Sequence, residues 1–237
     1  MKIVVPALLL TVLTGFTGLV YEVIWQKYLA TLLGSHSEAT AAVLAIFLGG
    51  LALGYALFGR ATRWLLVRAR ERGTEPRLLY FYALLELGIG LYALVFPWLV
   101  EGARVVSLWG PVGQGGLSFA FDVMLSALLL GPPAVLMGGT VPILTLALSR
   151  DVEQSTRIHA WVYGFNTVGA FLGAIAAGFL LVPLLGLDRL VQLMGCLNLV
   201  AAAIFAQLDA KAPRLAELSE DATASPRVEG FATWAVV

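Results

Sequence analysis

Residues 158–185 read IHAWVYGFNTVGAFLGAIAAGFLLVPLL and contain no Asp, Glu, Lys or Arg. About 20 apolar residues are enough for an α-helix to cross the roughly 30 Å hydrocarbon core of a bilayer. This stretch therefore predicts a membrane-spanning helix. Five other stretches meet the same condition, so the six expected spans are residues 4–33, 39–59, 78–100, 117–148, 158–185 and 190–208. The expected fold is an all-α integral membrane protein of about six transmembrane helices.

The composition of the whole chain agrees with this fold class. Of its 237 residues, 59% are hydrophobic and 13% are charged, whereas charged residues make up about 25% of an average soluble domain. These values exclude a soluble enzyme, a disordered protein and a nucleic-acid-binding protein. The 15 Lys and Arg residues balance 15 Asp and Glu residues, so no net charge attracts an anionic partner. We expect the lipid bilayer, and no nucleic acid, as a partner.

The basic residues are divided unequally between the two sides of the expected membrane domain. Cytoplasmic loops carry an excess of Lys and Arg, so this division predicts orientation. The side with both termini carries Lys2, Arg60, Arg63, Arg68, Arg70, Arg72, Arg77, Arg150, Arg157, Lys211, Arg214 and Arg227. The other side carries Lys27, Arg104 and Arg189. We therefore expect both termini in the cytoplasm, and the bacterial cytoplasmic (inner) membrane as the location.

Three segments are expected along the chain. Residues 1–208 form the six-helix transmembrane domain. Residues 209–230, DAKAPRLAELSEDATASPRVEG, turn polar with two prolines and mixed charge, which indicates a solvated cytoplasmic linker. Residues 231–237, FATWAVV, are apolar again but too few to span a bilayer. They are either a tail or the start of a further, truncated helix, and we favour truncation.

Two carboxylates fall inside expected spans. Glu22 lies in the first and Glu86 in the third. A charge near the centre of a spanning helix costs about 2.5–3.5 kcal/mol on insertion scales, so each carboxylate needs a partner or a cavity. At a rise of 1.5 Å per residue, we expect the two at depths about 10 Å apart, which does not suit a shared metal ion. Each is either hydrogen-bonded across a helix contact or binds a cation or proton.

Small residues recur at helical spacing in the first and fifth spans. Gly15 and Glu22 share one helix face, and Asn166, Gly169 and Gly173 share another. Small residues in this pattern indicate close helix contacts. We therefore expect Glu22 to face a neighbouring helix and Asn166 to lie at one end of a packing face.

The fourth span contains two interruptions. Pro132 and Pro133 lie near its midpoint, and Pro142 follows a Gly-Gly-Thr sequence that ends at Thr140. Proline removes a backbone donor and clashes with the carbonyl four residues earlier, so we expect a kinked or broken helix. In transporters such breaks often mark the ligand site, but they also occur as plain kinks. Both interpretations stay open for this span.

The sequence contains no catalytic or metal-binding motif. His36 and His159 have no ligand spacing to a second His or Cys. There is one cysteine, Cys196, and no Ser-His-Asp arrangement, HExxH or Gly-rich phosphate loop. We predict no catalytic residue, no metal site and no cofactor in this chain.

Four segments of the chain occur in an order that points to a known family. They are GFTGLVYEVIW at 15–25, LGS at 33–35 with FLGGLALG at 47–54, LMGGTVP at 136–142, and YGFNTVGA at 163–170. Together they resemble the membrane domain of fused spermidine synthase-like proteins, over about residues 10–190. That domain is commonly described as resembling a major-facilitator transporter.

The resemblance carries several functional expectations. In that family a soluble aminopropyltransferase-like domain follows the membrane helices, binds decarboxylated S-adenosylmethionine and transfers an aminopropyl group to putrescine. That domain is not found in this sequence, so no catalytic residue is carried over. Glu22 in YEVIW and Asn166 in NTVG match the family motifs, which give them no role. With neighbouring motif residues and the buried carboxylate, the candidate ligand-binding set is Tyr21, Glu22, Trp25, Glu86, Thr140, Tyr163 and Asn166.

The leading interpretation is a membrane-integral module of a spermidine synthase-like protein. It would anchor an aminopropyltransferase and bind or pass polyamines, with a soluble synthase domain or a second membrane half as partner. One alternative is half of a major-facilitator-like transporter for a small cation, since six helices and a basic loop after the second are typical of such a half. The other is a purely structural membrane subunit whose glycine faces dock other helices.

Overall fold

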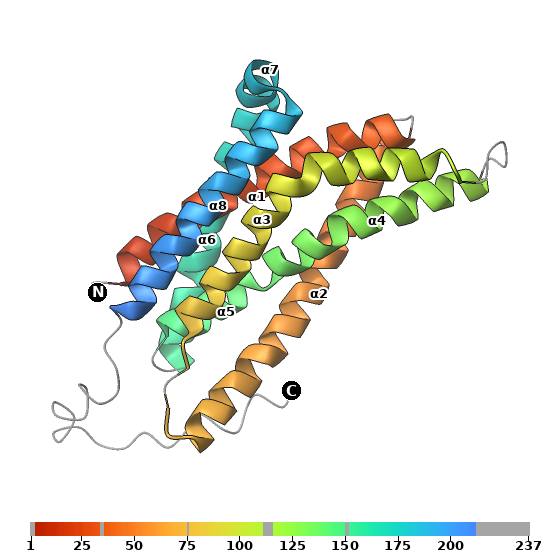
Figure 1. Cartoon of the computed structure of the whole chain (residues 1–237). Coiled ribbons are helices and arrows are strands. Elements are labelled where there is room, and N and C mark those ends of the chain that lie inside the picture. Colours follow the sequence, from red (N-terminus) through yellow and green to blue (C-terminus); the bar gives the residue numbers. More distant parts are fainter. Residues whose placement is uncertain (1–2, 34–35, 75, 111–115, 150–151, 212–237) are drawn as a thin grey trace, which may run out of the picture.

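The computed structural model describes residues 3–33, 36–74, 76–110, 116–149 and 152–211, and all regular structure in these ranges is helical. The elements shown in Figure 1 are α1 Val4–Leu33, α2 His36–Glu71, α3 Leu78–Ser107, α4 Gly116–Gly138, α5 Thr140–Leu148, α6 Val152–Ala176, the π-helical turn η1 Ala177–Leu181, α7 Val182–Leu185 and α8 Leu187–Ala210. Six stretches are long and apolar enough to cross a membrane: Val4–Leu33, Thr40–Ala69, Leu78–Ser107, Gly116–Leu148, Gln154–Leu185 and Leu187–Ala210. The all-α fold with six spans is thus confirmed.

Several helices extend past the expected spans. The helix α2 continues to Glu71, although the second span was expected to end at residue 59, because its last turns are rich in Ala, Leu and Arg, which favour helix. Gly73, two residues after the end of α2, has a φ of 62°, which suits the left-handed position that follows a helix. The helix α8 runs to Ala210, two residues past the expected boundary. Residues 212–230 of the expected linker and the apolar segment 231–237 lie outside the described residues.

Three pairs of helices pack along most of their length: α3 with α8, α1 with α6, and α2 with α4. The start of α1, the end of α8 and the Arg-rich end of α2 lie at one end of the bundle, and α7 lies at the other (Figure 1). Two apolar clusters fill the interior, one around Trp25 and Phe96 and one around Tyr82 and Phe205. Along α3, Glu86 lies between residues of these two clusters.

The fourth span is broken, as expected, and the break lies at Gly139 between α4 and α5. Pro142 has no N–H for the carbonyl of Gly138, so the α-helical bonding pattern stops there. Instead the Gly139 N–H donates to the Leu136 carbonyl at 3.1 Å, a tighter turn, and α5 resumes with the Ile143 N–H donating to Gly139 at 3.3 Å.

Pro132 and Pro133, by contrast, lie inside the continuous helix α4. Pro133 cannot donate to the carbonyl of Leu129, four residues earlier. The Tyr92 hydroxyl of α3 donates to that same carbonyl at 2.8 Å. A neighbouring helix therefore satisfies the acceptor that the proline leaves free, which is how transmembrane helices tolerate proline.

The fifth span changes its helical pitch before Pro183. The turn η1 is π-helical, with the Val182 N–H donating to the carbonyl of Ala177 five residues earlier. Such a bulge is a common way to accommodate a helix interruption. Gly186, with φ of 73°, then turns the chain into α8.

Candidate functional site

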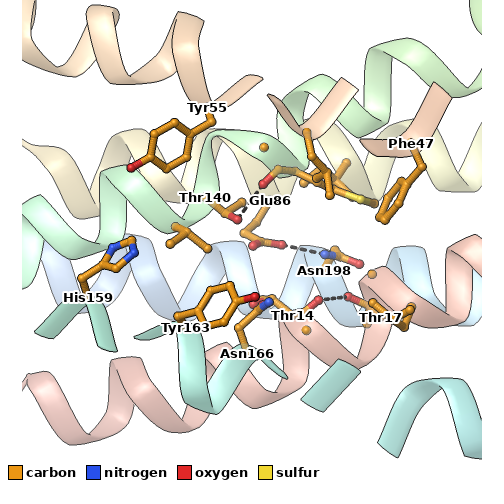
Figure 2. Close-up of a pocket in the computed structure, with 18 residues that line it drawn as sticks. Thr14, Thr17, Phe47, Tyr55, Glu86, Thr140, His159, Tyr163, Asn166 and Asn198 are labelled. Atoms are coloured by element: carbon orange, nitrogen blue, oxygen red, sulfur yellow. Dashed lines mark hydrogen bonds between the residues drawn. The ribbon is translucent and has the colours of Figure 1, made fainter. Parts of the chain in front are cut away.

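A cavity of about 300 Å³ lies inside the bundle between α1, α2, α3, α6, α8 and the α4–α5 break. Its walls are mainly apolar, with Leu19, Phe47, Leu51 and Ile89 among them. The polar side chains that line it are Thr14, Thr17, Tyr55, Glu86, Thr140, His159, Tyr163, Asn166 and Asn198 (Figure 2). A mainly apolar cavity with a few convergent polar groups is the usual form of a small-ligand site.

Glu86 is the charged residue of this cavity and lies on α3 with a relative exposure of 1%. Its Oε2 accepts a hydrogen bond from the Asn198 Nδ2 of α8 at 2.6 Å (Figure 2). Its Oε1 is buried and has no hydrogen-bond partner among the described residues. Within the same part of the chain, no Lys, Arg or His forms an ion pair with Glu86. Among the described residues, the carboxylate therefore presents one oxygen that makes no hydrogen bond within the usual distance, and the Tyr82 hydroxyl, one turn earlier on α3, interacts with the same carboxylate.

Asn198 links this carboxylate to α1. The Tyr21 hydroxyl donates to the Asn198 Oδ1 at 2.8 Å, while the Asn198 amide donates to Glu86. All three side chains are almost fully buried. The Asn198 Oδ1 accepts the bond from the Tyr21 hydroxyl, so the Asn198 Nδ2 is oriented toward Glu86 as the donor. The carboxylate is thus held in one place by three helices.

The α1–α6 contact forms one wall of the cavity. A Cβ on Gly15 would lie 2.2 Å from the carbonyl oxygen of Asn166, and a Cβ on Gly169 would lie 2.0 Å from that of Val12. The two backbones thus approach as closely as glycine allows. Gly18 has open space beside it and lines the cavity. This close approach sets the position of Asn166 and Tyr163 on the cavity wall.

The structure divides the expected ligand-binding residues into two groups. Four of them, Glu86, Thr140, Tyr163 and Asn166, line the cavity together. The remaining three lie on α1 and do not line it: Tyr21, Glu22 and Trp25. Of the two intramembrane carboxylates, Glu86 lines the cavity and Glu22 does not.

The three α1 residues have different surroundings. Tyr21 reaches the site through Asn198. Trp25 stacks on Tyr21 with ring centroids 5.7 Å apart, and its Nε1 is buried without a hydrogen-bond partner in the described part of the chain. Glu22 is only half-buried. Of the expected helix-break prolines, Pro142 lies one turn beyond the cavity residue Gly138, and Pro132 and Pro133 lie earlier in α4.

Several cavity residues were not predicted from the sequence. Asn198 interrupts the apolar run LNLVAAA, and the rule that singled out Glu86, a polar group at membrane depth, also applies to it. Thr14, Thr17 and Tyr55 give no such signal because hydroxyl side chains are common in membrane helices. His159, which has no ligand spacing to a second His or Cys in the sequence, lines the cavity, and its Nδ1 lies 3.2 Å from the Thr145 Oγ1. Across the described ranges no group of three His, Cys, Asp or Glu side chains is placed to hold a metal ion.

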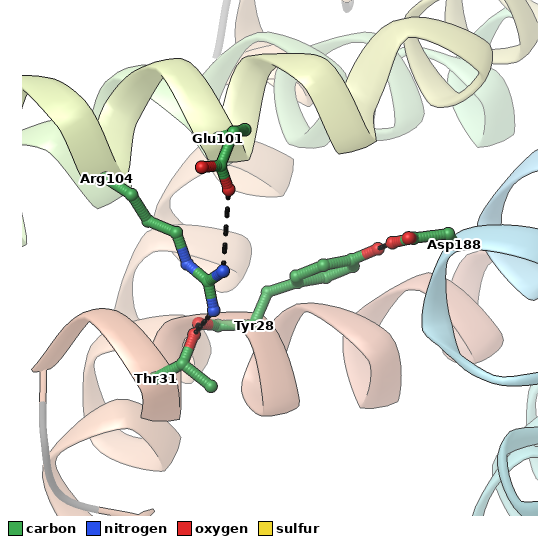
Figure 3. A network of polar contacts seen from close by, with 5 residues as sticks. All are labelled: Tyr28, Thr31, Glu101, Arg104 and Asp188. Carbon is green, nitrogen blue, oxygen red and sulfur yellow. Dashed lines mark hydrogen bonds and ion pairs between the residues drawn. The ribbon is translucent and has the colours of Figure 1, made fainter.

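A second polar network lies at the opposite end of the bundle from the Arg-rich end of α2. The Tyr28 hydroxyl bonds to Asp188 at the start of α8, and the Arg104 guanidinium of α3 donates to the Thr31 hydroxyl at 2.8 Å (Figure 3). Arg104 also lies 3.5 Å from Glu101. These contacts join the ends of α1, α3 and α8, and the exposed pair of Arg104 and Glu101 among them contributes little to stability.

The fold and the cavity define a class: an all-helical integral membrane protein with six spans and a mainly apolar cavity that a buried glutamate lines. Along 190 residues the chain is 28% identical to the polyamine aminopropyltransferase of Corynebacterium efficiens. The match covers 78% of this chain and 32% of that protein, so the chain spans about a third of the relative's length. No protein-family model and no solved structure matches the chain.

Proposed function

We propose that this chain is the membrane-integral module of a spermidine synthase-like protein, and that its internal cavity binds a polyamine at Glu86. The observation that carries the binding proposal is the buried Glu86 carboxylate, which has one oxygen without a hydrogen-bond partner in the described chain and no counter-cation there. The similarity to a polyamine aminopropyltransferase supports the ligand class.

The chemistry of the cavity suits an alkyl ammonium ion. Attraction between opposite charges is several times stronger in a low-dielectric interior than in water, so Glu86 would be the main anchor. An ammonium group has three N–H donors and no acceptor, and the oxygens of Asn166, Thr140 and Tyr163 are acceptors on the same cavity wall. The methylene segments of the ligand would pack against the apolar walls. A volume of about 300 Å³ limits the ligand to a small molecule.

Calorimetric titration of the purified protein in detergent with putrescine and spermidine tests this proposal. We expect saturable binding by the wild type, retained in Glu22→Gln and lost in Glu86→Gln. Glu22→Gln is the matched control because it removes an intramembrane carboxylate that does not line the cavity. Binding that survives in Glu86→Gln but is lost in Glu22→Gln would contradict the cavity site, and no binding by any form would contradict the polyamine proposal.

The helix break favours a second candidate, that the module passes polyamines across the membrane. Gly138 and Thr140, on either side of the break at Gly139, both line the cavity. Broken helices at a central cavity are typical of secondary transporters. Uptake of radiolabelled spermidine into proteoliposomes, under a proton or a sodium gradient, would support this candidate if Glu86→Gln abolishes it. Absence of uptake under both gradients leaves binding and anchoring without transport.

The anchoring role includes a topology proposal. We place the module in the bacterial inner membrane with both termini in the cytoplasm, where it would hold a soluble synthase domain or a second membrane half. The basic side chains at the shared end of α1, α2 and α8 support this orientation. Reporter fusions after Lys211 test it: green fluorescent protein should fluoresce, and alkaline phosphatase should be inactive. The reverse pattern would overturn the orientation.

A further inference from the structure

A second cavity is lined by residues from the end of α2, the start of α3 and the connection between them. The end of α2 and the start of α3 lie at the same end of the bundle as the start of α1 and the end of α8 (Figure 1). Its volume is about 360 Å³. Three arginines line it: Arg68 and Arg72 from the last turns of α2, and Arg77 immediately before α3. It shares no residue with the Glu86 cavity, and the proposed function does not use it.

The three arginines differ in their electrostatic partners. The Arg77 Nε lies 2.7 Å from the Asp209 carboxylate of α8, so its charge is compensated. Arg68 and Arg72 have no carboxylate at ion-pair distance among the described residues, and Glu71 between them is exposed. Within the described part of the chain, two guanidinium groups without an ion-pair partner therefore lie beside one cavity.

Two of these guanidinium groups make cation–π contacts with aromatic side chains. The Arg68 guanidinium lies 5.1 Å from the centre of the Trp64 ring, and that of Arg77 lies 4.6 Å from the centre of the Tyr80 ring. Trp64 is 57% exposed and Tyr80 is 41% exposed. Exposed Trp and Tyr next to arginines are typical of the level where a bilayer meets water. This pattern predicts that the cavity lies at the depth of the lipid headgroups.

The remaining wall of the cavity is apolar. Leu65, Phe81 and Leu84 line it together with the arginines, and Leu84 is exposed on the helix surface. One side therefore suits a phosphate, which Arg binds through paired N–H donors. The other side suits an acyl chain that continues along the helices. A free phosphate ion would use only the first of these two sides.

We propose that this cavity binds the phosphate headgroup of an anionic phospholipid, with Arg68 and Arg72 as the countercharges and Leu65 and Leu84 alongside the acyl chain. Described residues on either side of the connection between α2 and α3 are held by contacts within the chain itself. Gly73 has a positive φ, the Thr74 N–H donates to the Ala69 carbonyl at 2.9 Å, and Asp209 accepts a bond from the Tyr80 N–H at 3.1 Å. A preformed site binds with a smaller ordering cost.

Short-chain lipids test the proposal on the purified chain in detergent. Dioctanoyl phosphatidylglycerol, dioctanoyl phosphatidylcholine and inorganic phosphate are titrated separately by calorimetry. We expect the phosphatidylglycerol to bind more tightly than the other two. Each arginine near an anionic lipid contributes about fivefold in affinity, so the double variant Arg68→Gln/Arg72→Gln should weaken phosphatidylglycerol binding roughly 25-fold.

The control is Arg60→Gln/Arg63→Gln, which removes the same charge from exposed positions of the same helix outside the cavity. It should change the affinity less than about threefold, because the two sites are separate. Equal losses in the two double variants would show diffuse attraction and overturn the proposal, as would no loss in Arg68→Gln/Arg72→Gln. Inorganic phosphate binding as tightly as phosphatidylglycerol would overturn the lipid assignment. Arg68→Lys/Arg72→Lys keeps the charge but not the paired donors, and should fall between wild type and the glutamine variant.

Discussion

The two longest helix contacts of the bundle, α1 with α6 and α3 with α8, are built differently. In the first, Gly15 and Gly169 bring backbones so close that an added Cβ would lie 2.2 Å and 2.0 Å from a carbonyl oxygen. In the second, the glycines leave more room: a Cβ on Gly195 would lie 2.9 Å from the Gly90 carbonyl. The same contact also buries the hydrogen-bonded pair of Glu86 and Asn198.

This difference suggests that the α1–α6 contact serves helix packing and that the α3–α8 contact contains the candidate site. The α1–α6 contact is complete in itself, because small residues and van der Waals contact are sufficient to hold membrane helices together. The α3–α8 contact contains a carboxylate oxygen that the described residues leave without a partner. Burying an unpaired polar group costs free energy, so a protein that keeps one gains something else from it. We therefore assign the proposed ligand binding to Glu86 and a packing role to the glycine faces.

The largest expected effect is at the α1–α6 contact. In Gly169→Ala the new Cβ would meet the Val12 backbone carbonyl, which cannot rotate away, so the helices must separate. We expect a loss of about 3 kcal/mol or more in the free energy of unfolding, at the upper end of overpacking. Titration with SDS in mixed micelles measures this free energy.

Gly164→Ala is the matched control for this prediction. It lies on the same helix, and nothing lies within 4 Å of its added Cβ. Alanine is the better helix former, so we expect no loss and a gain of up to about 1 kcal/mol. Similar free energies for Gly169→Ala and Gly164→Ala would contradict the close contact.

The next effect is at the α3–α8 contact. Asn198→Leu removes the donor to Glu86 and the acceptor for Tyr21 while keeping a similar side-chain volume. We expect a loss of about 2 kcal/mol, because a buried carboxylate is left unpaired. In Glu86→Leu/Asn198→Leu, measured by the same SDS titration, part of this loss should be recovered. Strict additivity of the two single substitutions would show that the residues are not coupled.

A smaller effect is expected at the glycine pair of the same contact. In Gly195→Ala the added Cβ lies 2.9 Å from the Gly90 carbonyl oxygen and 3.3 Å from the Ala93 Cβ, so the backbones of α3 and α8 must separate by a few tenths of an ångström. We expect a loss of about 1 kcal/mol, partly offset by the higher helix propensity of alanine. A loss as large as that of Gly169→Ala would remove the distinction between the two contacts.

Hydropathy alone predicted the six spans, because the bilayer imposes a minimum apolar length on every crossing helix. Helical spacing likewise placed Gly15, Gly169 and Gly173 on packing faces, and the structure puts each against a backbone carbonyl. Hydropathy and helical spacing could not predict which of the two carboxylates, Glu22 or Glu86, lines the cavity. This depends on the rotation of α1 and α3 in the assembled bundle, which contacts between distant parts of the sequence determine.

The hydrogen bond between Asn198 and Glu86 could not be predicted from the sequence for the same reason. Asn198 lies 112 residues after Glu86, and no local pattern links the two. The effect of the prolines also depends on distant contacts. Pro133 does not interrupt α4, and the Tyr92 hydroxyl, on another helix, donates to the Leu129 carbonyl that the proline leaves free. The π-helical turn before Pro183 was also missed, since the sequence shows a proline but not how the helix accommodates it.

The smallest expected effect is at the end of the α3–α8 contact, where Arg77 and Asp209 form an ion pair at 2.7 Å. The Arg77 side chain is 61% exposed and the Asp209 side chain is 7% exposed, so solvent screens the pair from the arginine side and its contribution stays at about 1 kcal/mol or less. Asp209→Asn removes the charge but keeps an oxygen for the Tyr80 N–H, so we expect a loss of about 0.5 kcal/mol that diminishes at high salt. Asp209→Leu also removes that oxygen and should cost more, because the N–H at the start of α3 loses its acceptor. SDS titration at low and high salt measures both variants. Equal losses in the free energy of unfolding for Asp209→Asn and Asn198→Leu would contradict this ranking. The α3–α8 contact would then depend on the Arg77–Asp209 ion pair as strongly as on the buried pair of Glu86 and Asn198.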